Sequence, residues 1–142
     1  MLETLELIAG DTPGVTYALP ILRFEGVGKG GTGGGRTTYI QGALHAQELP
    51  GAVAIHCLVP RLKAAEAEGR LRAPITIVPH ANPIGLNQSI LFEPMGRFDL
   101  NSRTNFNRAF PLPGAAPVDG FTAAPERLKA RLMELSATAD IV

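Results

Sequence analysis

Two residues with metal-binding side chains, His45 and Glu48, stand three positions apart in the segment 42–48, GALHAQE. Imidazole and carboxylate groups are zinc ligands, and a catalytic zinc takes three protein ligands and leaves a fourth position for water or substrate. Two ligands alone make an incomplete site. A plainer interpretation is that His45 is a hydrogen-bonded residue at the end of a strand and Glu48 a favourable charge at a helix N-terminus.

The elements on either side of this pair predict where the two side chains lie. Residues 37–44 have the β-branched and aromatic enrichment of a strand, and apolar residues recur at helical spacing from Pro50 to about residue 68. Residues 74–79 form a short apolar strand, so residues 37–79 predict a strand-helix-strand unit with parallel strands and a right-handed crossover. Both His45 and Glu48 then lie beyond the carboxyl end of the sheet, where open α/β sheets bind ligands.

The remaining segments predict further parts of an α/β sheet. Residues 16–25 are extended in character, and Pro20 favours an edge strand because it cannot donate to a ladder. The glycine-rich residues 26–35 predict a mobile hairpin connection, since a strand follows them where a nucleotide-binding fingerprint needs a helix. Residues 80–121 predict a long ordered loop region, and residues 123–137 a helix capped by Thr122. Residues 139–142 begin another strand.

Composition limits the classes of partner. Thirteen basic residues balance thirteen acidic ones, which disfavours nucleic acid and anionic membranes as partners. Hydrophobic residues make up 45% of the chain and charged residues 18%, a globular composition consistent with one domain over residues 1–142. The single cysteine, Cys57, fits a reducing compartment. With no apolar run of membrane-span length and an acidic N-terminus, the expected location is the cytoplasm.

Three further segments accompany the His-x-x-Glu pair: 82–88 (NPIGLNQ), 96–100 (GRFDL) and 105–111 (NFNRAFP). In order and approximate spacing, the set resembles the succinylglutamate desuccinylase and aspartoacylase family, which is similar to the zinc carboxypeptidases. The resemblance spans residues 38–142. It implies a zinc carboxypeptidase-like mixed sheet with flanking helices, of which this chain is the N-terminal part.

The resemblance also implies roles for individual residues. His45 and Glu48 would be zinc ligands, and Asn107 with Arg108 would hold a substrate carboxylate, a group that a guanidinium fork matches bidentately. Without the zinc motif nearby, a structural salt bridge for Arg108 and a turn for Asn107 would be preferred. The arginine that polarises the carbonyl under attack is assigned to Arg97, with Arg103 as the substitute, because the segment before Asn107 departs from the commoner Asp-Leu-Asn-Arg pattern.

The family's third ligand, a histidine, and its general base, a glutamate, are expected beyond residue 142. The spare histidine at a strand end, His80, is expected to be structural or to support a ligand. The predicted function is a zinc-dependent amidohydrolase that removes an acyl group from an N-acyl amino acid. The alternatives are a zinc carboxypeptidase acting on short peptides and a noncatalytic domain that binds a carboxylate or a partner. For these 142 residues alone, the expectation is weak or no metal binding and no turnover.

Overall fold

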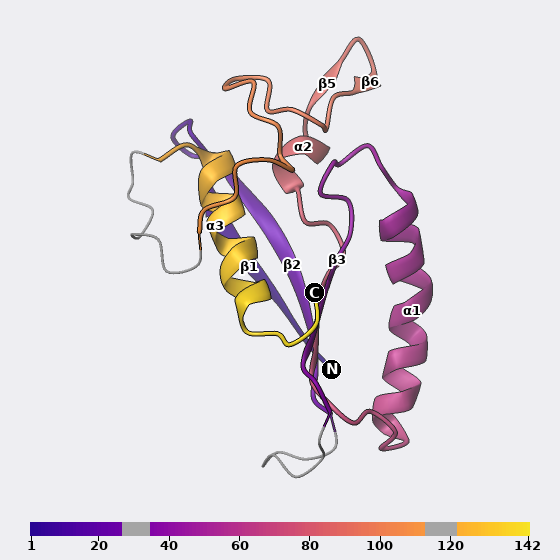
Figure 1. The fold of residues 1–142 in the computed structure, drawn as a ribbon. Helices are drawn as coiled ribbons and strands as arrows, with labels where there is room; N and C mark the ends of the chain where they lie inside the picture. The colour runs from indigo at the N-terminus through magenta and orange to yellow at the C-terminus, as the bar shows by residue number, and fades with distance from the viewer. Residues whose placement is uncertain (27–34, 113–121) are drawn as a thin grey trace.

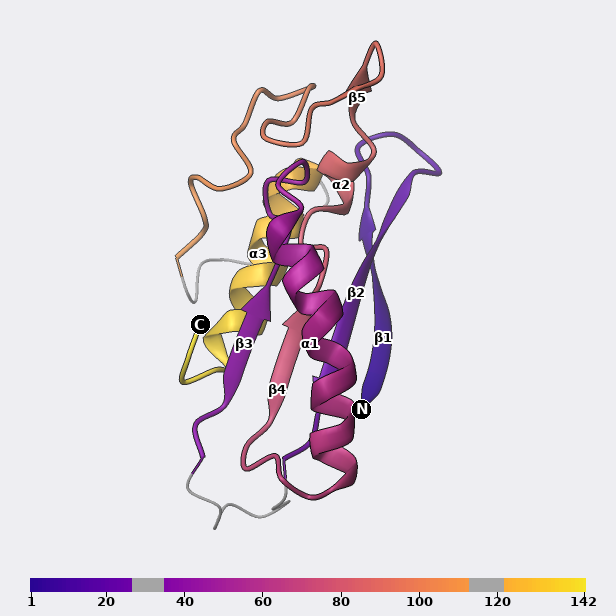
Figure 2. The ribbon, with the colours of Figure 1, turned by 90° about the vertical axis from the view of Figure 1, so that its right-hand side faces the viewer.

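The computed structural model describes residues 1–26, 35–112 and 122–142, so the predicted glycine-rich connection lies largely outside the described residues. A four-stranded mixed sheet has the order β1-β2-β4-β3, with β3 parallel to β4 and the other pairs antiparallel. Helix α1 covers one face of this sheet and helix α3 the other (Figures 1 and 2). The strands are β1 (Leu2–Ala9), β2 (Thr16–Phe24), β3 (Thr38–Gln41) and β4 (Ile75–Val78).

The predicted strand-helix-strand unit is confirmed. Strand β3 is followed by α1 (Pro50–Ala67), which ends before Gly69, whose φ of 66° suits a helix C-terminus. Strand β4 then pairs in parallel with β3, from Thr38 opposite Ile75 to Gln41 opposite Val78. Strand β3 ends at Gln41, whereas residues 37–44 were predicted to be strand. It is shorter because the chain turns away at Gly42 and Ala43, and Ala43 has a positive φ of 53°.

The prediction of an edge position for the strand that contains Pro20 is wrong. Strand β2 lies between β1 and β4, and Pro20 pairs with Leu5 of β1. The β4 pairing covers only Leu22–Phe24, so the missing N–H of Pro20 falls outside that ladder. Strand β2 therefore forms a hairpin with β1, a strand that the sequence analysis did not identify. The hairpin expected between β2 and β3 is not formed, because β4 lies between these two strands.

Helix α3 (Ala124–Ala137) is confirmed, but its predicted cap is not. The N-cap position is Ala123, which makes no side-chain cap bond. Instead the Asp11 carboxylate, in the turn between β1 and β2, accepts a hydrogen bond of 2.7 Å from the backbone N–H of Ala124. A carboxylate at this end also suits the positive end of the helix dipole.

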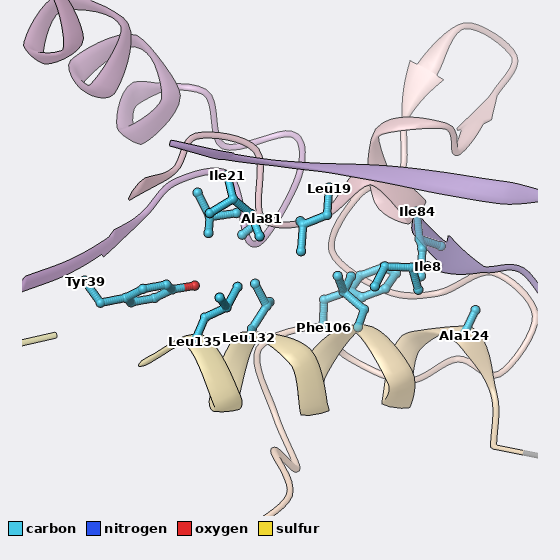
Figure 3. Packing of buried hydrophobic residues seen from close by; sticks show 12 residues of the cluster. Ile8, Leu19, Ile21, Tyr39, Ala81, Ile84, Phe106, Ala124, Leu132 and Leu135 are labelled. Carbon is cyan, nitrogen blue, oxygen red and sulfur yellow. The ribbon is translucent and has the colours of Figure 1, made fainter. Parts of the chain in front are cut away.

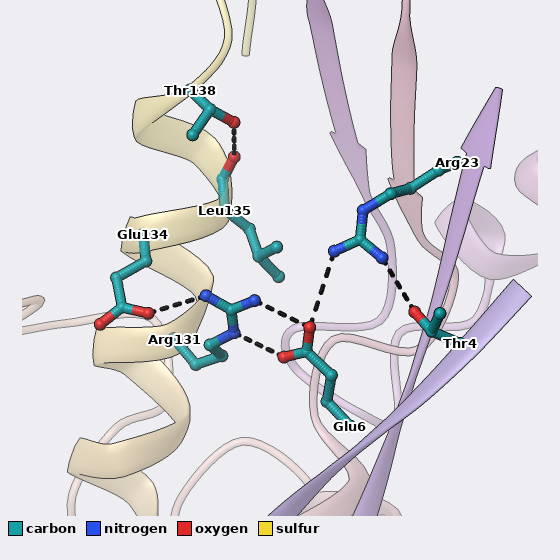
Figure 4. A network of polar contacts seen from close by, with 7 residues as sticks. All are labelled: Thr4, Glu6, Arg23, Arg131, Glu134, Leu135 and Thr138. Carbon is teal, nitrogen blue, oxygen red and sulfur yellow. Dashed lines mark hydrogen bonds and ion pairs between the residues drawn. The ribbon is translucent and has the colours of Figure 1, made fainter. Parts of the chain in front are cut away.

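Buried side chains form two clusters, one on each side of the sheet. The larger packs α3 against the sheet (Figure 3) and includes Phe106, which is fully buried. The smaller lies under α1 and joins Ile55 to Leu22, Phe24 and Ile77. At the rim of the larger cluster, the Glu6 carboxylate of β1 pairs with Arg131 of α3 and Arg23 of β2 (Figure 4).

The predicted loop region after β4 contains a short helix and a small hairpin, which lie beyond the carboxyl ends of β3 and β4 (Figure 1). These are α2 (Pro83–Leu86), β5 (Ser89–Ile90) and β6 (Glu93–Pro94). The predicted final strand is seen as a parallel bridge between Thr38 and Ile141. Among the described residues, no helix is both long and apolar enough to cross a membrane.

Candidate metal centre

His45 and Glu48 face each other in the loop between the end of β3 at Gln41 and the start of α1 at Pro50. The Nδ1 atom of His45 lies 3.3 Å from Oε1 of Glu48, with the imidazole 7% exposed and the carboxylate 52% exposed. Tetrahedral zinc at bond lengths of about 2.0–2.1 Å places neighbouring ligand atoms roughly 3.3–3.4 Å apart. The nature and separation of these two atoms therefore fit a pair of zinc ligands.

Arg97 is brought to this pair, and Arg103 is not. The Nη2 group of Arg97 contacts Glu48 Oε1, the same oxygen that faces the histidine. Residues 99–104 form a closed loop in which the buried Asp99 accepts from the backbone N–H of Ser102 at 2.7 Å. Arg103 belongs to this loop, where its side chain is exposed and its backbone N–H donates to the Asp99 carbonyl at 2.8 Å.

The segment after this loop returns to the site. An antiparallel bridge pairs Phe98 with Asn105, and the N–H of Phe106 donates to the carbonyl of Arg97 at 3.2 Å. The Phe106 side chain is buried in the core. The residues after the bridge form a turn, in which the N–H of Arg108 donates to the carbonyl of Asn105 at 3.2 Å. Unlike Phe106, Asn105 is half-buried and Asn107 is exposed, and Asn105 Oδ1 lies 3.0 Å from Nε2 of His45.

A cavity of about 410 Å³ opens beside the pair and is lined by both His45 and Glu48 and by Asn107. The predicted carboxylate partner Asn107 thus shares the cavity with the predicted ligands. Arg108 is not among the lining residues: its exposed guanidinium donates to the backbone carbonyl of Asn107 at 2.6 Å. On the wall of the cavity lies Gln41, whose Oε1 accepts from the Tyr39 hydroxyl at 2.9 Å. Burial raises the pKa of the Tyr39 hydroxyl.

Backbone contacts between loops hold the His45 loop in place. The N–H of Ala46 donates to the carbonyl of Gly96 at 2.9 Å, and a Cβ on Gly96 would lie 2.5 Å from that of Ala46. Behind the loop, the fully buried Asn82 donates to the Leu44 carbonyl at 2.9 Å and accepts from the Gly85 N–H at 2.8 Å. The sequence analysis assigned no role to Asn82, although an Asn before Pro is a signal for a helix N-cap.

Within residues 1–26, 35–112 and 122–142, no group of three or more His, Cys, Asp or Glu side chains is placed to hold a metal. The other histidines lie elsewhere: His56 and His80 both line a groove between α1 and strand β2. Cys57 is exposed on α1. The described part of the chain therefore offers two ligands.

Comparison with known proteins identifies relatives of this fold. The model of the succinylglutamate desuccinylase/aspartoacylase catalytic domain matches residues 34–141. A succinylglutamate desuccinylase/aspartoacylase family protein from Shewanella amazonensis superposes with a TM-score of 0.79 at 23% identity, over 99% of this chain and 45% of its own. No curated protein matches the chain.

Two further solved structures have a fold similar to that of this chain. A protein described as a succinylglutamate desuccinylase/aspartoacylase from Shewanella frigidimarina gives a TM-score of 0.79 at 21% identity, over 99% of this chain and 44% of its own. An aspartoacylase family protein from Mesorhizobium loti gives a TM-score of 0.63 at 21% identity, over 95% of this chain and 37% of its own. The chain thus spans less than half the length of the solved structures that it matches, and at these identities they show the fold.

Proposed function

The chain belongs to the succinylglutamate desuccinylase/aspartoacylase family, and from that premise we propose that it carries the first half of the site of a zinc-dependent amidohydrolase, which removes the acyl group from an N-acyl amino acid. The observation that carries the proposal is the convergence of His45 Nδ1 and Glu48 Oε1 at 3.3 Å beside a cavity that Asn107 also lines. An imidazole nitrogen and a carboxylate oxygen are ligands that zinc accepts.

Each side chain has a distinct task in this proposal. His45 and Glu48 would hold the zinc ion, which when bound polarises the amide carbonyl and lowers the pKa of a bound water. Arg97 would donate to the oxygen on which negative charge develops, and its contact with Glu48 keeps it next to the ligands. Asn107 and Arg108 would orient the substrate by its carboxylate.

The third ligand is expected on a strand beside β3. The N–H of Tyr39 donates to the carbonyl of Ile141 at 2.8 Å, and the bridge between Thr38 and Ile141 is parallel. A strand that continues in this direction runs toward the same edge of the sheet as His45. A histidine within about ten residues of that bridge, a window set by ordinary strand length, would reach the cavity.

Calorimetric titration of the chain with zinc tests the ligand assignment. We expect weak binding from two ligands, lost in His45→Ala and retained in His56→Ala, a matched exposed histidine on α1. Binding that survives His45→Ala would contradict the assignment. Tight stoichiometric binding to these 142 residues would contradict the incomplete site.

The proposed reaction needs a separate test, made on a protein that contains the third ligand. N-acyl amino acids with a free carboxylate should be cleaved, and the same compounds with that carboxylate amidated should not. Preference for short peptides would favour a zinc carboxypeptidase instead. Metal binding without cleavage of either class would favour the noncatalytic alternative.

A further inference from the structure

We infer that Asn105 is the positioning residue of this site: its side-chain oxygen holds His45 in the tautomer that leaves Nδ1 free for the cation, and ties that ligand to the segment that binds the carboxylate. The inference deepens the proposed function and rests on it for the role of the cation. The hydrogen-bond geometry that supports it involves only residues of the described chain.

The orientation of the Asn105 amide follows from its neighbours. The backbone N–H of Asn107 donates to Asn105 Oδ1 at 2.8 Å, so the atom at this position is the oxygen and not the amide nitrogen. The same oxygen lies 3.0 Å from Nε2 of His45. Since an amide oxygen only accepts, Nε2 must carry the proton.

The tautomer of His45 has a consequence at the other ring nitrogen. A neutral imidazole protonated on Nε2 presents a lone pair on Nδ1. That lone pair faces Glu48 Oε1, which is also an acceptor, at 3.3 Å. Two acceptors that face each other need a proton or a cation between them. Asn105, which contacts the Nε2 side of the ring, thus leaves a lone pair on Nδ1 that can bind a cation together with Glu48.

A turn-forming role alone does not explain this arrangement. An Asn side chain that accepts from the N–H two residues on is an ordinary turn element. The second bond, to a histidine 60 positions away in the sequence, has no part in such a turn. Because one oxygen serves both bonds, displacement of the 105–107 segment moves the ligand His45 and the lining residue Asn107 together. Partners of this kind typically alter metal affinity about 10–100-fold when removed.

The test uses the metal-free chain, so that its outcome is independent of zinc. Long-range ¹H–¹⁵N spectra at about pH 8.5, above the usual titration range of imidazoles, report which nitrogen of His45 is protonated. We expect the Nε2–H form in the unmodified chain and in Asn105→Asp, which keeps an acceptor oxygen. Asn105→Ala should give a mixture of tautomers and a shifted Asn107 amide, whereas Asn101→Ala, an exposed residue of the same loop, should change neither.

An Nδ1–H form in the unmodified chain, or an unchanged tautomer in Asn105→Ala, would overturn the inference. If Asn105→Ala does not fold, the tautomer in Asn105→Asp and in the unmodified chain still decides the matter. Zinc titration then separates the two claims. Zinc binding that survives His45→Ala, together with a tautomer that depends on Asn105, would support the positioning role and refute the zinc assignment.

Discussion

Gly96→Ala should damage the site and the fold together, because two loops meet there without room for a side chain. A Cβ on residue 96 would lie 2.5 Å from the Cβ of Ala46 and 2.9 Å from the backbone nitrogen of Gln47, where ordinary contact begins at 3.4 Å. The loops must separate by roughly 0.9 Å, and most of the resistance comes from backbone.

The free-energy cost follows from two effects. Overpacking of this kind costs about 1–3 kcal/mol. Separation also stretches the 2.9 Å hydrogen bond from the Ala46 N–H to the Gly96 carbonyl, worth about 1 kcal/mol net. We expect a loss of about 2–4 kcal/mol in the free energy of unfolding, or on the order of 10 °C in midpoint for a domain of this size.

A matched control is available in the same neighbourhood. Gly51 also lines the cavity, but outside α1 the nearest atom of the described residues to a Cβ there would be Gly42 Cα at 3.6 Å. Since it lies in the first turn of α1, Gly51→Ala should leave stability equal or raise it by up to about 1 kcal/mol. Urea denaturation of both variants measures the difference. Equal stability of Gly96→Ala and the unmodified chain would refute the close approach of the two loops.

Two further changes test the contacts of α3. The hydrogen bond from Arg131 lowers the pKa of Glu6 below 4.5, so its stabilisation is present above that pH and is lost as pH falls through the lowered pKa. Glu6→Gln should cost about 1 kcal/mol at neutral pH and flatten acid unfolding, unlike Glu3→Gln. Lys129 is buried, its Nζ has no hydrogen-bond partner among the residues that the structure describes, and desolvation lowers its pKa. Lys129→Met should raise the unfolding midpoint by a few degrees, whereas exposed Lys63→Met should not; a lower midpoint would contradict it.

Local patterns in the sequence predicted the elements whose residues are neighbours in the chain. Helix α1, helix α3 and strand β4 follow from apolar spacing and from the composition of short segments. Strand β1 carries a period-two signal in its sequence, because polar Thr4 and Glu6 alternate with apolar Leu5 and Leu7, but this signal predicts the wrong face, since the structure exposes both leucines. The position of β2 inside the sheet could not have been predicted in this way. Pro20 fits there because β2 pairs with β4 only over Leu22–Phe24, so the missing N–H of Pro20 falls outside that ladder.

In the candidate site, too, residues close together in the sequence were predicted, and a contact between distant residues was not. The residue types and spacing singled out His45 and Glu48, and the structure brings them together. The partner of His45 at Nε2 was not predicted, because Asn105 is distant in sequence and was noted only as a departure from a pattern. That departure was nevertheless informative: an amide at this position accepts as a carboxylate would, but leaves the site with one negative charge fewer.

The geometry of the site depends on contacts between loops rather than on regular elements. His45 and Glu48 lie between β3 and α1, and the residues that hold them come from the segments around Asn82, Gly96 and Asn105. Two of these segments contain a buried group, Phe106 beside Asn105 and the Asn82 amide behind the His45 loop. Loops without such anchors open easily, and a pair of ligands that must keep a separation near 3.3 Å tolerates little movement. The buried side chains of these loops therefore fix the positions of the ligands, and Phe106, which also belongs to the larger core cluster, links the site to the packing of α3 on the sheet.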